Sequence, residues 1–242
     1  MVILLVVLFV GIAVTVTWYQ GMKRYQALSV SPIVKKQAYQ FKMENLKIPA
    51  GIYFSPTHSW AHMQANGRAK IGVDAFLHGL TGVLSSVQVP EQGVSLKQGE
   101  PMFSIVHKDK KLSITAPISG QVKSINMEAL QNMRMIHRDP YSTGWLVEMQ
   151  PTNWEQETKR LYLGQRTTAW LTSEMGRIRD FFAHSFAPPD SESGLVLLQD
   201  GGDIADCALA FAGKGLWGSF QKLILDQANL DFKQASETSH NQ

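Results

Sequence analysis

Two short motifs constrain this chain more than any other feature: Ala-Pro-Ile-Ser-Gly at residues 116–120 and Asp-Pro-Tyr-Ser-Thr-Gly-Trp-Leu at residues 139–146. In the second motif, Asp139-Pro140 sets a turn, Gly144 permits a backbone angle that other residues avoid, and Trp145 begins a strand and supplies apolar area. Sharp turns between short strands are typical of a small β-sandwich or barrel.

The segment from Leu46 to Pro151 carries strand and turn signals throughout. Asn66-Gly67, between two runs of strand-forming residues, predicts a hairpin with a two-residue type I′ turn, which needs positive φ at both central positions. A second hairpin is expected from strands at 102–107 and 112–115, closed by Lys108-Asp109-Lys110-Lys111. We therefore predict a β-rich domain at residues 46–151.

Helical signals begin where the β-rich segment ends, apart from a short turn that Asp74 is expected to cap. The stretch Gln165–Ser185 places apolar residues on one face, which predicts an amphipathic helix. Further helices are expected near 203–211 and 216–227, and the polar last residues are expected to be disordered. The sequence thus predicts a helical extension at 152–232 and a disordered tail at 233–242.

The N-terminal segment from Met1 to Trp18 contains no charged side chain. As a helix with a rise of about 1.5 Å per residue it would span roughly 27 Å, close to the thickness of a bilayer core. A secretory signal peptide would need basic residues before this run and a small-residue cleavage motif after it, and neither is present. We predict a transmembrane anchor at residues 1–22 and a linker or stalk at 23–45.

The distribution of charge predicts the orientation of the transmembrane anchor. Lys23, Arg24, Lys35 and Lys36 follow the apolar run, and the positive-inside rule places their side of the membrane in the cytoplasm. The single cysteine, Cys207, agrees with that side, because exported proteins of this size more often carry paired cysteines. The formal net charge of +3 is too small to argue for nucleic acid. The predicted localisation is the cell membrane, single-pass, with a cytoplasmic soluble part.

Three further features accompany the two motifs in the same order along the chain: His58-Ser59-Trp60, Ile71-Gly72-Val73-Asp74 and Asn126. Together, from Tyr53 to Pro151, they resemble the H-protein of the glycine cleavage system. Ala-Pro-x-Ser-Gly recurs in biotinyl and lipoyl domains, whereas Asp-Pro-Tyr-x-x-Gly-Trp-Leu is more particular to H-proteins. The resemblance implies a mainly β, lipoyl-type barrel-sandwich hybrid. It also implies a carrier without catalytic residues, whose lipoate is amide-linked to a lysine at a hairpin tip.

The position of that lysine is where the sequence departs from the family pattern. Alignment forward from Phe103 places Lys110 at the lysine position, whereas alignment backward from Ala116-Pro117 places Asp109 there. The hairpin is therefore one residue short relative to the family.

The residues beside the candidate lysine depart from the pattern as well. His107 stands where the family has an acidic residue, and Lys111 stands where it has a small one. Lys110 is the preferred candidate for lipoyl attachment, and Lys108 and Lys111 are less favoured substitutes.

Two interpretations of the H-like segment stay open. In the first, the protein is a membrane-anchored lipoyl carrier with lipoate on Lys110, whose partners are a lipoate ligase and a membrane-associated redox or assembly complex. In the second, it is a degenerate, unlipoylated H-like domain that acts as an adaptor or scaffold. A minor alternative is a periplasmic membrane-fusion adaptor. Those proteins insert a coiled coil between two lipoyl halves, and no heptad insertion interrupts residues 108–111 here.

Other residues with chemical potential favour ordinary structural roles. His58 and His62 would share one face of a strand, but no third ligand accompanies them, so packing or a surface position is favoured over a metal site. Cys207 lies among apolar residues, which favours a buried structural thiol over a nucleophile. We identify no metal site and no catalytic constellation in the sequence.

Overall fold

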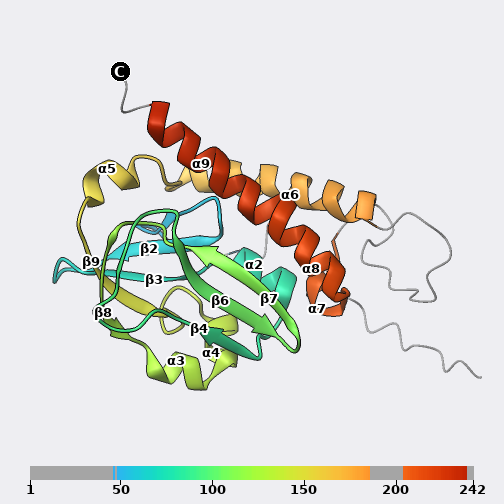
Figure 1. Cartoon of the computed structure of the whole chain (residues 1–242), viewed down its shortest axis with the longest axis horizontal. Coiled ribbons are helices and arrows are strands. Elements are labelled where there is room, and N and C mark those ends of the chain that lie inside the picture. Colours follow the sequence, from blue (N-terminus) through green and yellow to red (C-terminus); the bar gives the residue numbers. More distant parts are fainter. Residues whose placement is uncertain (1–45, 47, 186–203, 239–242) are drawn as a thin grey trace, which may run out of the picture. The chain divides into compact units, whose positions relative to one another are not determined.

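The computed structural model describes residues 46, 48–185 and 204–238, and all of them belong to one compact unit (Figure 1). The predicted anchor at 1–22 and the predicted linker at 23–45 lie outside the described residues. The helix that ends the described part continues through Thr238, into the first residues of the predicted tail.

Two antiparallel sheets form the β-rich domain, which confirms the prediction for this part of the chain. The larger sheet has the strand order β1-β2-β3-β9-β8-β5, and the smaller has the order β4-β6-β7. The strands are β1 (Tyr53–Phe54), β2 (Ser59–Met63), β3 (Ala69–Val73), β4 (Ser86–Gln88), β5 (Ser95–Leu96), β6 (Pro101–His107), β7 (Lys110–Thr115), β8 (Gly120–Ile125) and β9 (Val147–Pro151).

Helices connect and cover these sheets. They are α2 (Ala75–Thr81), α3 (Met127–Gln131), α4 (Met133–Arg138), α5 (Trp154–Thr158), α6 (Gln165–Ser185), α7 (Ala208–Phe211), α8 (Lys214–Phe220), the π-helical segment η2 (Gln221–Asp226) and α9 (Gln227–Thr238). We refer to residues 208–238, from α7 to α9, as the C-terminal arm. In Figure 1 its last three segments form one long rod that crosses over the β6–β7 hairpin, and α8 and η2 both contact β7.

The predicted localisation is contradicted by the structure. None of the helices within 46, 48–185 and 204–238 is both long and apolar enough to cross a membrane. The segment on which the prediction of a single-pass membrane protein rested is outside these ranges.

The β2–β3 hairpin is confirmed, but its turn differs from the expected one. The N–H of Gly67 donates to the carbonyl of Gln64 at 3.0 Å, and within this turn only Gly67 has positive φ, at +76°. The Asn66 side chain accepts the N–H of Arg68 at 3.0 Å. A turn that ends in one left-handed glycine needs no positive φ at Asn66, so the type I′ prediction is wrong.

The motif glycines are required for space. A Cβ on Gly120 would lie 2.4 Å from the carbonyl oxygen of Gln150, because β8 and β9 pair closely at this point. A Cβ on Gly144 would lie 2.6 Å from the carbonyl oxygen of Asp139 and 2.9 Å from Cα of Ile136. Gly144 is not among the residues with positive φ, so the expected unusual backbone angle is wrong there.

The other motif residues fasten the ends of elements to one another. Asn126 is buried, its amide donates to the carbonyls of Thr143 and Trp145, and its oxygen accepts the N–H of Ala129. The hydroxyl of Tyr141 accepts the first N–H of α2 at 3.0 Å. These contacts hold the 139–146 motif against Asn126 and against the start of α2.

The short helix expected after Asp74 is also confirmed. The Asp74 carboxylate accepts the N–H of Leu77 at 2.8 Å, as an N-cap does, and the helix continues to Thr81. The predicted helix at 165–185 matches α6 in both bounds.

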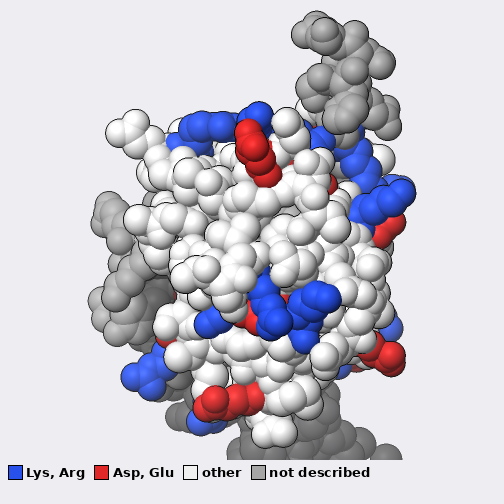
Figure 2. All heavy atoms as spheres, turned by 90° about the vertical axis from the view of Figure 1, so that its left-hand side faces the viewer, with Lys and Arg blue, Asp and Glu red and all other residues white. Residues whose placement is uncertain are grey.

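Charged side chains on the face shown in Figure 2 lie in several small groups, with acidic side chains beside some of the basic ones. Across the larger sheet, Arg68 pairs with Glu148 at 3.3 Å, and Ser124 donates to the same carboxylate at 3.2 Å. The Arg68–Glu148 pair is one place where opposite charges of the described residues lie side by side.

We expect opposite effects of an added methyl group at a glycine whose Cβ position is blocked by backbone and at one whose Cβ position is open. We expect Gly120→Ala to lower the free energy of unfolding by about 2 kcal/mol or more, because the Cβ meets backbone that cannot move aside. Gly176, inside α6, has open space around its Cβ position, so Gly176→Ala is expected to raise the free energy by about 0.5–1 kcal/mol. Urea unfolding of both variants measures this. Equal effects of the two substitutions would contradict the close approach of β8 and β9.

Candidate functional site

The β6–β7 hairpin carries the three candidate lysines, and its turn is shorter than expected. Only Lys108 and Asp109 form the turn, and Lys110 is the first residue of β7, opposite His107. Lys108 adopts a left-handed φ of +58°, and its N–H donates to the hydroxyl of Ser85 at 2.8 Å. The predicted four-residue closure at 108–111 is therefore wrong, and the hairpin tip is Lys108-Asp109.

The preferred candidate, Lys110, is buried, with only 7% of its surface exposed. Its Nζ donates to the carbonyl of Ala210 at 2.7 Å and to the carbonyl of Ala212 at 2.9 Å. The ammonium also lies 5.4 Å from the ring centroid of Trp217, within the range of a cation–π contact. Burial, reinforced by the charge of Lys108, lowers the pKa of Lys110 below its usual range. The two bonded carbonyls and the Trp217 ring all belong to the C-terminal arm.

The less favoured candidates are placed differently. The side chains of Lys108 and Lys111 are exposed, as is that of Asp109. The structure thus separates the three lysines into one that the arm covers and two that face solvent at or beside the tip.

The arm makes two further contacts with the β-rich domain, one at β7 and one in the turn before β6. Strand β7 is at the edge of the smaller sheet, and Gln221 accepts the N–H of Ser113 at 2.7 Å and donates to its carbonyl at 3.2 Å. A neighbouring antiparallel strand would make the same pair of bonds, so the Gln221 side chain takes the place of such a strand at Ser113. Near the other end of the arm, Asn229 donates to the carbonyl of Gly99 at 3.1 Å.

A second polar cluster joins the β-rich domain to α6. His58 is fully buried, and its ring lies parallel to that of Phe76 at 5.1 Å between centroids. Its Nδ1 is 2.9 Å from Asp74, and its Nε2 is 3.4 Å from Glu174. Glu174 in turn accepts from Arg177 at 2.6 and 2.9 Å. Within the described residues these side chains form an ion-pair chain that crosses from the β2 end to α6.

The protonation of His58 follows from this setting. Burial alone lowers the pKa of the imidazole, but the charges and hydrogen bonds of Asp74 and Glu174 outweigh it and raise the pKa to about 9. The histidine is therefore a cation between two carboxylates. Its ring packs on Phe76 within this ion-pair chain, and the described residues contain no group of three or more side chains that could hold a metal ion.

The remaining candidate from the sequence, Cys207, is half-buried and free. Burial and the nearby carboxylate of Asp206 raise the pKa of its thiol to about 11. A thiol with that pKa stays protonated near neutral pH and is a poor nucleophile.

Comparison with known proteins identifies the β-rich part. The glycine cleavage H-protein family matches residues 52–174, just over half of the 242 residues. The chain belongs to this family.

Individual glycine cleavage system H proteins are similar to this chain over about half of its length. The glycine cleavage system H protein of Stenotrophomonas maltophilia is 31% identical over 115 residues, which cover 48% of this chain and 88% of that protein. The probable glycine cleavage system H protein of Pyrococcus abyssi is 28% identical over 127 residues, covering 52% of this chain and 94% of that protein. The crystal structure of the H protein from Mycobacterium marinum is 29% identical, with a TM-score of 0.41, and the match covers 43% of this chain and 87% of that one.

The C-terminal end of the family match separates the lysine hairpin from the arm that packs on it. It stops at Glu174, so the H-protein-like, lipoyl-type domain includes the hairpin with its lysines, and the arm that covers Lys110 lies beyond the match. The sequence located the three candidate lysines, but it did not predict that the C-terminal arm packs over Lys110. Trp217 lies in a predicted helix, yet nothing in its spacing indicates the strand that the helix packs against.

The cluster around His58 predicts a specific dependence of stability on pH. Because the pKa of His58 in the folded protein exceeds the value of 6.5 for an unfolded histidine, its contribution is complete below about pH 6.5 and is lost as the pH rises through 9. The loss is on the order of 3 kcal/mol. We expect His58→Gln to remove most of this slope in urea unfolding from pH 6.5 to 9.5.

A matched control is available on the same helix. His184 is exposed at the end of α6, so His184→Gln is expected to keep the slope of the unsubstituted protein. Burial lowers the pKa of His78 to about 3, so this histidine is neutral in the folded protein throughout the window. Its contribution to stability changes only near pH 6.5, where the unfolded histidine loses its proton. A pH profile that His58→Gln leaves unchanged would contradict the charged histidine.

Proposed function

We propose that this chain is an unlipoylated H-protein-like adaptor, in which Lys110 holds the C-terminal arm against the hairpin instead of carrying lipoate. The observation that carries the proposal is the position of the Lys110 ammonium between the carbonyls of Ala210 and Ala212. In this family the lysine has to be exposed at a hairpin tip. Here it is buried, and it lies one residue past the tip.

The chemistry of acylation supports this proposal. An amide nitrogen on Lys110 would keep a single hydrogen and no charge, so it could serve only one of the two carbonyls. The other carbonyl would be left without its donor, which costs about 1–3 kcal/mol when the group is buried. The acyl chain would also have to displace Trp217, whose ring is 1% exposed and packs against the ammonium.

The residue at the hairpin tip, Asp109, also supports an unlipoylated domain. Asp109 stands in the turn, at the place where alignment from the Ala-Pro motif puts the modified lysine. Its carboxylate cannot form an amide with the carboxyl group of lipoate, because neither group supplies the amine.

An adaptor function requires a protein partner, which the H-like domain would bind through the surfaces that the arm leaves open. It needs no catalytic residue and no lipoate ligase. A second candidate is a lipoyl carrier modified on Lys108, and the observation in its favour is that Lys108 is exposed within the turn itself.

The two candidates differ in mass. We expect the full-length protein, purified from cells that lipoylate their other acceptors, to have the unmodified mass by intact-mass spectrometry. A lipoyl increment that disappears in Lys108→Arg would replace the adaptor with the second candidate. An increment that disappears only in Lys110→Arg would overturn the structural role of Lys110.

The structural role also predicts an effect on stability. Lys110→Met keeps the apolar stem but removes the ammonium, and leaves two carbonyls of the arm without their donor. We expect it to lower the free energy of unfolding by about 1–3 kcal/mol and to speed amide hydrogen exchange in residues 208–220. Lys111→Met is the matched control, because that side chain is exposed, and it is expected to stay within about 0.5 kcal/mol. Equal effects of the two variants would show that the contact with the arm is unimportant.

A further inference from the structure

One side of the rod formed by α8, η2 and α9 is exposed, and in Figure 1 this rod lies at the surface of the molecule. Its exposed residues occur as adjacent pairs at every fourth position: 214–215, 218–219, 222–223, 226–227 and 230–231. Two of them have large apolar side chains, Leu223 at 57% and Leu230 at 52% exposed. We refer to these ten residues as the outer face of the rod.

The π-helical segment η2 keeps the five pairs on one side of the rod. Four residues of an α-helix turn about 40° beyond a full circle, because the helix has 3.6 residues per turn. Four residues of a π-helix, whose hydrogen bonds span five residues, stop short of a full circle. With Gln221–Asp226 in this form, the two offsets partly cancel. The outer face is therefore a nearly straight strip, about 25 Å long.

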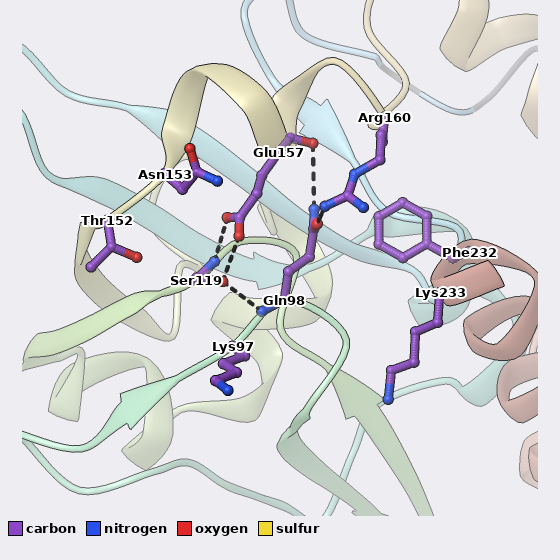
Figure 3. A pocket seen from close by; sticks show the side chains of 9 residues that line it. All are labelled: Lys97, Gln98, Ser119, Thr152, Asn153, Glu157, Arg160, Phe232 and Lys233. Carbon is purple, nitrogen blue, oxygen red and sulfur yellow. Dashed lines mark hydrogen bonds between the residues drawn. The ribbon is translucent and has the colours of Figure 1, made fainter. Parts of the chain in front are cut away.

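The opposite side of the rod is packed against the rest of the chain. Its buried residues are Trp217, Phe220, Ile224, Leu225 and Ala228. Figure 3 shows the ring of Phe232 beside the guanidinium of Arg160, and the ring centroid lies 5.4 Å from that group. Because these contacts fix the orientation of the rod, Leu223 and Leu230 stay outside the core and are available to a partner.

The charged residues of the outer face are divided between its two ends. Lys214 and Lys222 lie in the first half, and Asp226 and Asp231 lie in the second half. None of the four forms an ion pair with any of the described residues, and each carboxylate accepts one hydrogen bond from a glutamine of the rod. The face is therefore positive at one end and negative at the other.

We propose that the outer face binds a second copy of this chain, with the two rods antiparallel about a two-fold axis that passes between Lys222 and Leu223. The first residues of the five pairs form one row and the second residues form another. The symmetry places each row against the other row of the second copy. Lys214 of each copy then faces Asp231 of the other, and the two Leu223 side chains meet near the axis.

The small residues of the outer face leave room for the leucines. Leu230 of one copy faces Gly215 of the other, beside Gly218, and a Cβ added at either glycine would meet nothing within 4 Å. The absence of side chains there lets the two rods approach closely, because the distance between packed helices depends on the side chains at the contact. Asp226 faces Ser219, whose hydroxyl is a donor for the carboxylate.

A second copy is the occupant that the charge pattern favours. In a parallel pair, Lys214 would face Lys214 and Asp231 would face Asp231, and both contacts would be repulsive. In the antiparallel pair the two ends meet with opposite signs, and the symmetry makes this contact twice. The face offers about ten residues per copy, against about 20–30 in a standard interface, so we expect dissociation in the micromolar range. The inference does not depend on whether any lysine carries lipoate.

Sedimentation velocity of the full-length protein, over a range of about 1–200 µM, tests the proposal. We expect a monomer that forms a dimer as the concentration rises. Lys214→Asp and Asp231→Lys are each expected to weaken the dimer about tenfold or more, because each homodimer then holds two pairs of like charges. An equimolar mixture of the two variants is expected to regain the original affinity within about threefold, because both pairs in the mixed dimer have opposite charges.

Exposed leucines provide the matched control. Leu223→Asn is expected to weaken the dimer, whereas Leu163→Asn, at a leucine outside the arm that is 38% exposed, is expected to leave it unchanged. All the substituted residues are exposed, so the variants are expected to keep the fold, which circular dichroism checks. A monomer at every concentration, a dimer that the single charge variants leave intact, or a mixture as weak as its components would each overturn the proposal.

Discussion

The Lys110 ammonium, held by two carbonyls of the arm, is the contact on which the relation between the β-rich domain and the C-terminal arm depends. A buried ammonium has three hydrogens to place, and here two of them go to Ala210 and Ala212 while the ring of Trp217 covers the charge. The residues that meet are separated by 100 and 102 positions in sequence. A contact of this range costs chain entropy to form, so it persists because each group it buries has its partner.

The two-residue turn at Lys108-Asp109 explains why the Lys110 ammonium can reach the arm. A hairpin alternates its side chains between two faces, so a change of one residue moves every following side chain to the other face. With a two-residue turn at Lys108-Asp109, Lys110 pairs with His107 and points to the face that the arm covers, while Lys111 is exposed. The short turn and the contact of Lys110 with the arm are therefore parts of one arrangement.

Much of the H-like domain could be predicted from sequence because its signals are local. The Asp74 cap, the β2–β3 hairpin and the bounds of α6 each follow from neighbouring residues. The predictions that were wrong concern contacts between residues that are distant in the sequence. The requirement at Gly144 comes from Asp139 and Ile136 folding back upon it, and no φ preference reveals such an approach.

The candidate site was predictable only in part for the same reason. The resemblance narrowed the candidate lysine to three positions. The sequence does not show that Lys110 alone among them is buried, because its cover comes from Trp217 and the α7–α8 junction, about 100 residues away. His58 shows the same limit: its left-handed φ of +64° and its position between Asp74 and Glu174 are properties of the folded chain. The spacing between His58 and His62 in the sequence reveals neither the backbone angle of His58 nor its carboxylate partners.

The arm is held at several points along its length, and this determines how the protein can open. At one end Lys110 holds the α7–α8 junction, in the middle Gln221 binds the edge of β7 at Ser113, and near the far end Asn229 holds Gly99. Phe220, in the same rod, packs edge-on against Phe181 of α6 at 5.7 Å, and Arg177 reaches the carbonyl of Ile224. The Lys110 contacts lie at the α7–α8 junction, more than fifteen residues before Asn229 along the arm. Exposure of Lys110 therefore requires the bonds at this junction to break, because release of the Asn229 contact alone leaves both carbonyls and Trp217 in place.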